Sequence, residues 1–304
     1  MSTVVSGAPA RAWTNPQPGE VPRTAFVLAG GAALGAMQAG MLEALFERGI
    51  TPDLLVGTSA GALNAAFLAS RPPTVATARE LAAIWRDLHR SDVLPFSPAT
   101  LIRGLAGRRG HLVSDRKLRQ LAVRHLQFER LEQAGIPLHL VAFDLLSGRE
   151  ARLSEGPVID AVLAAAAIPG VLPPVPWHGR LLADGGMANN TPISHAVRLG
   201  ANRVYVLPTV NAAERGLPRP PRSPLIAGLH AVTLLANGRL QYDLARYAPA
   251  VELIVLPVVN PRQVGPGDFA HGSQLIKQAL YAARTALAAH DAESVGAPNP
   301  LRAA

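Results

Sequence analysis

Short apolar runs alternate along this chain with longer segments in which apolar residues recur at helical spacing. The apolar runs predict buried strands at residues 25–28, 54–56, 138–143, 181–183, 204–207 and 253–258. The segments between them predict helices at residues 36–48, 60–69, 77–89, 114–125, 158–167, 192–199, 225–247 and 273–290. Strands that alternate with helices are typical of a parallel sheet covered on both faces. We therefore expect an α/β fold, a three-layer α/β/α sandwich around a mostly parallel central sheet.

Length and composition fit one sizeable domain, because a chain of 304 residues that is 49% hydrophobic can bury a full core. Residues 1–22 are small, polar and proline-bearing, so we expect a flexible tail there and no signal peptide. The motifs described below predict a catalytic core over residues 23–207, followed by an exposed Pro/Arg-rich connector over 208–224. Residues 225–291 are expected to pack on the same domain, before a frayed tail over 292–304.

The strongest chemical signal lies in residues 53–66. A short apolar run ends in Gly57-Thr58-Ser59-Ala60-Gly61, a Gly-x-Ser-x-Gly pattern, and passes at once into an alanine-rich helix. A strand, a cramped turn with one serine and a helix make up a nucleophile elbow. The two glycines remove Cβ atoms that would clash across such a turn, and the amides that open the helix favour negative charge. We predict that Ser59 is a catalytic nucleophile, with an ordinary glycine-rich turn as the alternative.

A serine nucleophile needs a base and a site for an oxyanion, and two further segments offer them. The predicted strand at residues 24–29 runs into the small-residue loop Gly30-Gly31-Ala32-Ala33-Leu34-Gly35. Unpaired amides in such a loop suit an anion or an oxyanion. Downstream, a short strand at residues 180–183 ends in Asp184-Gly185-Gly186, which places a carboxylate at a tight turn.

These three blocks, in this order, resemble the patatin-like phospholipase family, whose pattern is a glycine-rich loop, Gly-x-Ser-x-Gly and a later Asp-Gly-Gly or Asp-Gly-Ala. Residues 38–45, 166–174 and 189–192 look like the family too, so the resemblance covers about residues 24–207. It implies a lipid acyl hydrolase in which Ser59 is the nucleophile and Asp184 is the sole base, a dyad without histidine. It also implies an oxyanion hole made by amides of Gly30, Gly31, Ala32 and Ala33.

The mechanism that this resemblance implies passes through an acyl-enzyme and needs neither a metal nor a cofactor. A lone carboxylate is a weak base, so we expect a partly apolar site to raise the pKa of Asp184. Acyl transfer or thioester hydrolysis on the same two residues is the alternative activity.

The loop departs from the family pattern at two positions. The family usually has three consecutive glycines, and an Arg or Lys just before the last glycine of the loop; this chain has Ala32 and Leu34 there. Alanine suits the loop if its φ stays negative. Loss of the cation removes a charge near the oxyanion or the head group, which leaves turnover rate and head-group preference open. A lipid-binding protein with weakened catalysis is therefore a further alternative.

A Ser-His-Asp hydrolase is the competing catalytic interpretation, because it also uses a nucleophile elbow, in the order serine, acid, histidine. Asp144 or Asp184 would be its acid, and the candidate histidines are His195, His230 and His271. None of these histidines follows a strand in a glycine-flanked context, and a packing or surface role is commoner for each.

Several other classes of function find no support in the sequence. A dinucleotide-binding loop would need glycine at Ala32, and no acid ends a suitable second strand. The chain has no cysteine, no His-x-x-x-His and no Asp-rich loop, so we expect no disulfide and no metal, and a cytoplasmic location fits. The net charge is +8, but basic residues are scattered and only 5% of residues are aromatic, which argues against nucleic acid as a partner.

The expected partner is a lipid or another acyl ester. No apolar stretch reaches the ~18 residues that span a bilayer. Arg103, Arg108 and Arg109 cluster in a Gly/Leu-rich segment at residues 101–112. This segment has two interpretations: a solvated loop, or a basic and partly apolar flap that contacts an anionic membrane surface near the active site. The sequence indicates no oligomeric state.

Overall fold

The computed structural model describes residues 23–95, 98, 100, 102, 106, 110–210, 224–259 and 264–296. At its centre is an eight-stranded sheet in the order β5-β6-β3-β2-β1-β7-β8, with β4 also paired to β3. The strands are β1 (Thr24–Leu28), β2 (Leu54–Thr58), β3 (Leu138–Asp144), β4 (Glu150–Leu153), β5 (Val175–Trp177), β6 (Arg180–Asp184), β7 (Arg203–Leu207) and β8 (Glu252–Val255). Strands β3, β2, β1, β7 and β8 are parallel, whereas β4, β5 and β6 join through antiparallel pairs.

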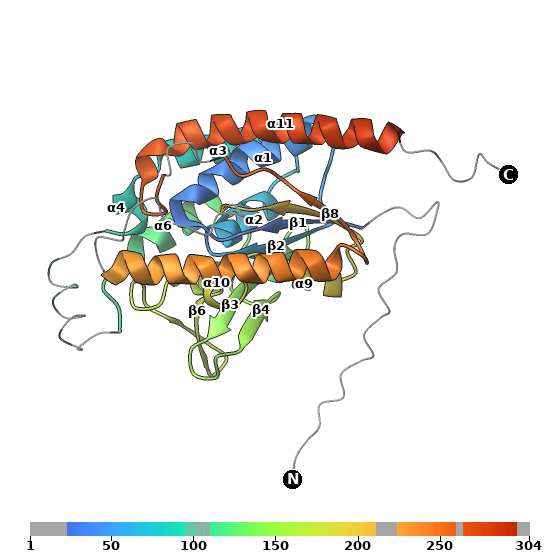
Figure 1. Ribbon diagram of the computed structural model, residues 1–304. Coiled ribbons are helices and arrows are strands. Elements are labelled where there is room, and N and C mark those ends of the chain that lie inside the picture. Colours follow the sequence, from blue (N-terminus) through green and yellow to red (C-terminus); the bar gives the residue numbers. More distant parts are fainter. Residues whose placement is uncertain are drawn as a thin grey trace, which may run out of the picture.

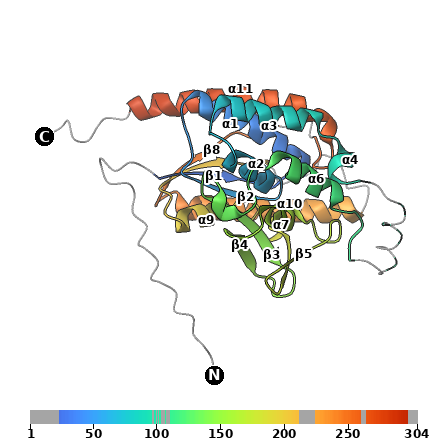
Figure 2. The ribbon, with the colours of Figure 1, turned by 180° about the vertical axis from the view of Figure 1, so that it is seen from behind.

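Helices cover both faces of this sheet, as Figure 1 and the reverse view in Figure 2 show. One face carries α1 (Ala36–Glu47), α2 (Ala60–Ala69), α3 (Val75–Asp87), α6 (Arg116–His125), α7 (Val158–Ala166) and α11 (Gly272–Gly296). The other face carries α9 (Ile193–Arg198) and α10 (Pro224–Tyr247). The predicted three-layer α/β/α sandwich with a mostly parallel central sheet is confirmed.

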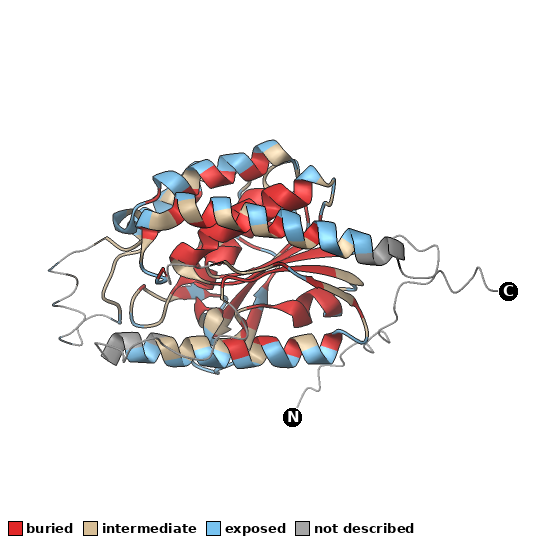
Figure 3. Ribbon diagram, turned by 45° about the horizontal axis from the view of Figure 1, so that its top comes forward, coloured by how far each residue is buried: buried red, intermediate tan, exposed pale blue. Residues whose placement is uncertain are grey.

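The apolar runs of the strands are continuous because both faces of the sheet are buried. In β1, Phe26 and Leu28 point into the larger core on the α1 side. Ala25 and Val27 point the other way, into the smaller core beside α9 and α10. Figure 3 shows the consequence: the central strands β1 and β2 are fully buried, while the long outer helices are buried along one side and exposed along the other.

The element boundaries differ from the sequence prediction in a few places. The predicted helix at residues 77–89 corresponds to α3, which begins at Val75 and ends at Asp87, and α11 continues to Gly296, six residues beyond its predicted end at residue 290. The short elements that were not predicted include α4 (Arg90–Val93), β4, β5 and α8 (Gly186–Asn189). Each has four residues or fewer, which is too short for a hydrophobic period to be recognised.

Several predictions fall on residues that the structure does not describe. They concern the tail at residues 1–22, the end of the C-terminal tail, most of the connector, and the cluster of Arg103, Arg108 and Arg109. The membrane-contacting flap therefore stays a prediction. Among the helices that are described, none is both long enough and apolar enough to cross a bilayer.

Candidate active site

The carboxyl ends of β2 and β6 meet on one edge of β3. Thr58, the last residue of β2, pairs with Val141, and Asp184, the last residue of β6, pairs with Ala142. Both Val141 and Ala142 also pair with β4, which must lie on the opposite edge of β3. Strands β2 and β6 therefore share an edge and run toward each other. This topology brings Ser59 and Asp184 together although 125 residues separate them.

Ser59 and Asp184 are joined by a direct hydrogen bond. Ser59 Oγ donates to Asp184 Oδ2 over 2.6 Å, and the N–H of Gly186 donates to Asp184 Oδ1 over 2.8 Å. Asp184 is only 4% exposed. This burial raises the pKa of Asp184 to about 6, and the two hydrogen bonds to its carboxylate oppose the rise. The expected increase in the pKa is confirmed, and it makes the carboxylate a stronger base than an exposed aspartate.

Ser59 lies at the turn between β2 and α2 in a conformation that side-chain-bearing residues rarely adopt, with φ of 55° and ψ of −124°. The flanking glycines permit this turn. A Cβ atom on Gly57 would lie 2.5 Å from the carbonyl oxygen of Gly61, and one on Gly61 would collide with the carbonyl of Leu28 in β1. The clash predicted across the turn thus occurs at Gly57, while Gly61 is needed for packing of α2 against β1.

The small-residue loop after β1 approaches Ser59 closely, and it continues into the 3₁₀ helix η1 (Ala32–Gly35). Two of its four predicted oxyanion donors are already engaged, because the N–H of Gly30 donates to Asn190 O over 3.1 Å and that of Ala33 donates to Pro266 O over 3.0 Å. Within the part of the chain that the structure describes, the amides of Gly31 and Ala32 have no such acceptor. Gly31 and Ala32 are therefore better placed as donors than Gly30 and Ala33, and the oxyanion hole itself stays a prediction.

Gly30 nevertheless matters for the close approach of the loop to the serine. A Cβ atom at Gly30 would lie 2.9 Å from Ser59 Cβ. Its carbonyl accepts hydrogen bonds from Asn190 Nδ2, over 3.2 Å, and from Thr209 Oγ1. Thr58 is fixed on the same side, since its Oγ1 donates to Asn189 O over 2.9 Å. These contacts hold the loop, the turn and the segment after α8 as one unit.

A buried polar network behind the loop was not recognised from the sequence. Gln38 Nε2 donates to Ala29 O over 2.8 Å. Asn64 Nδ2 donates to Gly35 O over 3.0 Å and to Gln38 Oε1 over 2.8 Å. Trp85 Nε1 in turn donates to Asn64 Oδ1 over 2.9 Å. Buried side-chain hydrogen bonds of this kind restrict the backbone that they hold, so the network fixes the position of the loop. An asparagine within an alanine-rich helix was the only local signal.

The remaining motif residues support the same turn. Ala60 is the first residue of α2 and lines the cavity beside Ser59. Gly185 lies directly against the carbonyl of Val141, where a Cβ atom would not fit. Gly186 begins α8, and its amide is the one that holds Asp184. The sequence motifs thus mark the close backbone contacts that bring the three segments together.

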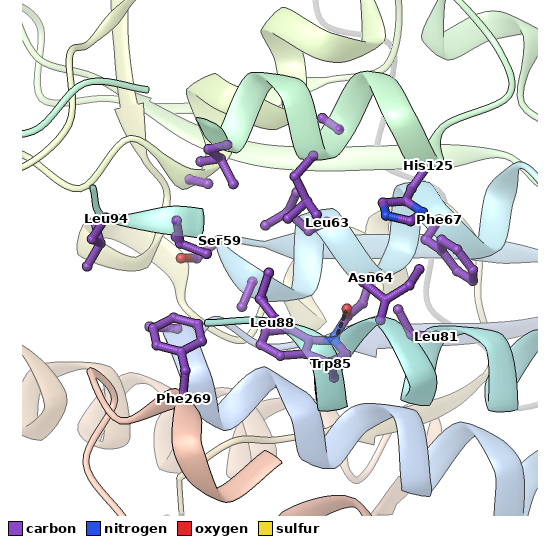
Figure 4. Close-up of a pocket in the computed structure, with 18 of the residues that line it drawn as sticks. Ser59, Leu63, Asn64, Phe67, Leu81, Trp85, Leu88, Leu94, His125 and Phe269 are labelled. Atoms are coloured by element: carbon purple, nitrogen blue, oxygen red, sulfur yellow. Dashed lines mark hydrogen bonds between the residues drawn. The ribbon is translucent and has the colours of Figure 1, made fainter. Parts of the chain in front are cut away.

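An apolar cavity opens beside Ser59 and extends along α2, between α3 and α6. Figure 4 shows Ser59 toward one end of the cavity, near Leu94 and Phe269, with Leu63 in the middle and Phe67 and His125 at the other end. Its walls are almost entirely aliphatic or aromatic. Apolar clefts with a small number of polar groups at one place are typical of ligand sites, and the hydroxyl of Ser59 is such a group.

Comparison with known proteins identifies the family. The sequence profile described as "Patatin-like phospholipase" matches residues 26–197. This chain belongs to the patatin-like phospholipase family. An uncharacterized NTE family protein of Mycobacterium tuberculosis is 32% identical over 197 residues, which cover 64% of this chain and 51% of that protein. This chain therefore spans about half the length of that relative.

Other relatives of this patatin-like protein are much longer. Patatin-like phospholipase domain-containing protein 6 of mouse is 30% identical over 60% of this chain and 13% of its own length. The lysophospholipase NTE1 of Mycosarcoma maydis is 27% identical over 60% of this chain and 9% of its own. Among solved structures, VipD from Legionella pneumophila matches with a TM-score of 0.41 and 14% identity, over 91% of this chain and 72% of that one.

The structure shows the surroundings of Ala32 and Leu34, the two positions at which the loop departs from the patatin-like pattern. Ala32 has a φ of 49°, so the negative φ under which alanine would suit the loop is not observed. A non-glycine residue in this region costs about 1–2 kcal/mol. Leu34 is 5% exposed and packs in the larger core, outside the lining of the cavity. Its side chain therefore does not occupy a position beside the reacting groups.

Two of the three histidines considered for a Ser-His-Asp triad, His195 and His271, pair with other carboxylates, and His230 lies in α10. His195 is buried and paired with Glu150, and His271 Nδ1 lies 3.0 Å from Asp268 Oδ2. Asp144 accepts from Ser147 Oγ and from a backbone amide in the β3–β4 turn. In the regions covered by the structure, no histidine hydrogen bonds to Ser59 or Asp184, and no cluster of three metal-ligating side chains is present.

Proposed function

We propose that this protein is a serine lipid acyl hydrolase that cleaves carboxylic esters of lipids through a dyad of Ser59 and Asp184. The observation that carries the proposal is the 2.6 Å hydrogen bond from Ser59 Oγ to the buried Asp184 carboxylate. An apolar cavity beside the serine supports a substrate with a hydrocarbon chain. Membership of the patatin-like phospholipase family, and a relative named as a lysophospholipase, support a lipid ester.

In the first half of the proposed reaction, Asp184 Oδ2 accepts the proton of Ser59 Oγ while that oxygen attacks the ester carbonyl carbon. The carbonyl oxygen becomes an oxyanion, which we assign to the amides of Gly31 and Ala32 together with that of Ala60, the residue after the nucleophile. The tetrahedral intermediate collapses when the bond to the alcohol breaks. Asp184 then returns its proton to the leaving alkoxide, and the acyl group stays on Ser59.

In the second half, a water molecule replaces the alcohol. Asp184 accepts a proton from this water as the water oxygen attacks the acyl-enzyme carbonyl. Collapse of the second intermediate breaks the bond to Ser59 Oγ, which recovers a proton from Asp184, and the fatty acid leaves. The N–H of Gly186 holds Asp184 Oδ1 through both halves, so Oδ2 stays directed at the serine.

Matched variants test the dyad. Ser59→Ala should abolish ester hydrolysis and labelling by a fluorophosphonate, and Asp184→Asn should lower kcat at least ~10²-fold, the range that a general base supplies. Asp144→Asn, His230→Ala and His271→Ala are the controls and should stay near the wild-type rate. Labelling of a different serine, or a histidine variant as inactive as Asp184→Asn with an unchanged circular dichroism spectrum, would refute the dyad.

A further inference from the structure

We propose that the cavity beside Ser59 selects acyl chains of about eight to ten carbons, and that Phe67 sets this limit. The inference rests on the proposed function, because the chain in question is the acyl group that Ser59 would carry. It goes further by naming the class of substrate, esters of medium-chain fatty acids, and one residue that determines specificity.

The cavity follows one face of α2 away from the serine. Leu63 and Phe67 are four residues apart on α2, so their side chains share that face, and Ser59, the residue just before α2, lines the same cavity. Figure 4 shows the three in this order, with Trp85 and Leu81 of α3 on the opposite side. The third wall is made by α6 and includes Leu118, Leu121 and Ala122. A chain attached to Ser59 Oγ would therefore extend parallel to α2.

The few polar groups in the walls leave the interior suited to hydrocarbon. The side-chain amide of Asn64 is fully occupied by Gly35, Gln38 and Trp85. His125 lies at the far end, and burial, more than the neighbouring arginines, lowers its pKa, which favours the uncharged form of its ring. A cavity with these walls favours methylene groups over water.

Phe67 closes the far end of the cavity, and Arg71 packs against its ring. The side chain of Phe67 is 3% exposed, and the guanidinium of Arg71 stacks 3.9 Å from the centre of its ring. Arg71 is itself fixed, since Nη1 donates to His125 O over 2.8 Å and Nη2 lies 2.9 Å from Glu80 Oε1. Arg71 is not part of the cavity lining. A chain that displaced Phe67 would therefore meet a buried, paired charge.

The spacing along α2 gives the length of chain that fits. Eight residues separate Ser59 from Phe67, and a helix rises 1.5 Å per residue, so the two positions are ~12 Å apart. An extended chain advances ~3.6 Å over three bonds, or ~1.2 Å per bond, so ~12 Å holds about ten bonds. Helical side chains lean toward the N-terminus of their helix, which brings the Phe67 ring closer to Ser59 and removes up to about two bonds. The result is about eight to ten carbons.

The test is a series of p-nitrophenyl esters with acyl chains from two to sixteen carbons. For the wild type, kcat/KM should rise by up to about fourfold per methylene until about eight to ten carbons, and then level off or fall. Phe67→Leu should move this optimum to longer chains, and Leu63→Phe, which fills the middle of the cavity, should move it to shorter ones. Phe46→Leu is the matched control, because Phe46 lies in the same core but outside the cavity, and it should leave the optimum unchanged.

The outcomes separate this inference from the proposed function. If the wild type hydrolyses short esters and a fluorophosphonate labels Ser59, but the profile shows no optimum, the inference is wrong and the proposed function stands. An optimum that neither Phe67→Leu nor Leu63→Phe shifts also refutes the inference. If the wild type hydrolyses no ester and Ser59 is not labelled, the proposed function itself fails. Two opposite shifts, with Phe46→Leu unchanged, would support the length limit.

Discussion

At the scale of single residues, Asp184 is the group whose chemistry depends most on its surroundings. Its carboxylate is buried, and two hydrogen bonds do not fully offset the cost of that burial, so its pKa rises to about 6. The same burial that strengthens the base lowers the stability of the fold when the base is charged. Activity and stability should therefore respond to pH in opposite directions around this residue.

This opposition gives a prediction for the pH dependence. In the proposed mechanism Asp184 must be ionised, so kcat/KM should fall about tenfold per pH unit below about pH 6. The pKa in the folded state is above the ordinary value of 3.8, so the folded state binds the proton more tightly than the unfolded state does. The contribution of Asp184 to stability is therefore present in full below about pH 4 and is lost as the pH rises through about 6.

Asp184→Asn checks the second half of this prediction, because asparagine cannot ionise. Relative to the wild type, the variant should gain on the order of 1–3 kcal/mol in the free energy of unfolding at pH 8, and much less at pH 4. Urea unfolding at both pH values measures this difference. Equal stability differences at pH 4 and pH 8, or an acid limb of kcat/KM near pH 4, would show that Asp184 titrates as an ordinary carboxylate.

At the scale of elements, the decisive segment is the loop and 3₁₀ helix after β1. Its sequence predicted small residues with free backbone amides, but long-range contacts decide which amides are free. The amide of Gly30 donates a hydrogen bond to the carbonyl of Asn190, and that of Ala33 donates to the carbonyl of Pro266. The sequence also gave no sign that Ala32 would adopt a positive φ. The local sequence pattern located this loop correctly. The hydrogen-bond partners of its backbone amides could not be predicted, because they come from segments far along the chain.

The same element predicts the effect of placing the family's usual cation at Leu34. Because the leucine is buried in the larger core, Leu34→Arg removes packed methyl groups and buries a charge. We expect a loss of at least about 3 kcal/mol in the free energy of unfolding, measured in urea by circular dichroism. Leu34→Met, which keeps volume and polarity, should lose less than about 1.5 kcal/mol. A stable Leu34→Arg variant with faster hydrolysis of anionic phospholipids would instead place this side chain beside the substrate.

At the scale of the whole molecule, the alternation of apolar and helical segments was sufficient to predict the three-layer sandwich and its parallel strands. It could not predict the antiparallel part of the sheet, because β4 and β5 are short and Pro176 interrupts the apolar pattern of β5. Yet that part of the sheet positions the proposed catalytic pair. The β5–β6 hairpin turns β6 against the direction of β2, so that Asp184 ends beside Thr58 on β3. The motifs identified Ser59 and Asp184 as partners, and only the topology explains how they meet.

The most direct measurement is the mass of the protein during turnover. Wild-type protein is mixed with p-nitrophenyl octanoate, quenched with acid, and analysed by intact-protein and peptide mass spectrometry. The proposed mechanism predicts an added octanoyl group on the peptide that contains Ser59, more of it in Asp184→Asn if deacylation is slowed more than acylation, and none in Ser59→Ala. An octanoyl group on another residue, or wild-type hydrolysis that Ser59→Ala retains in full, would contradict the mechanism.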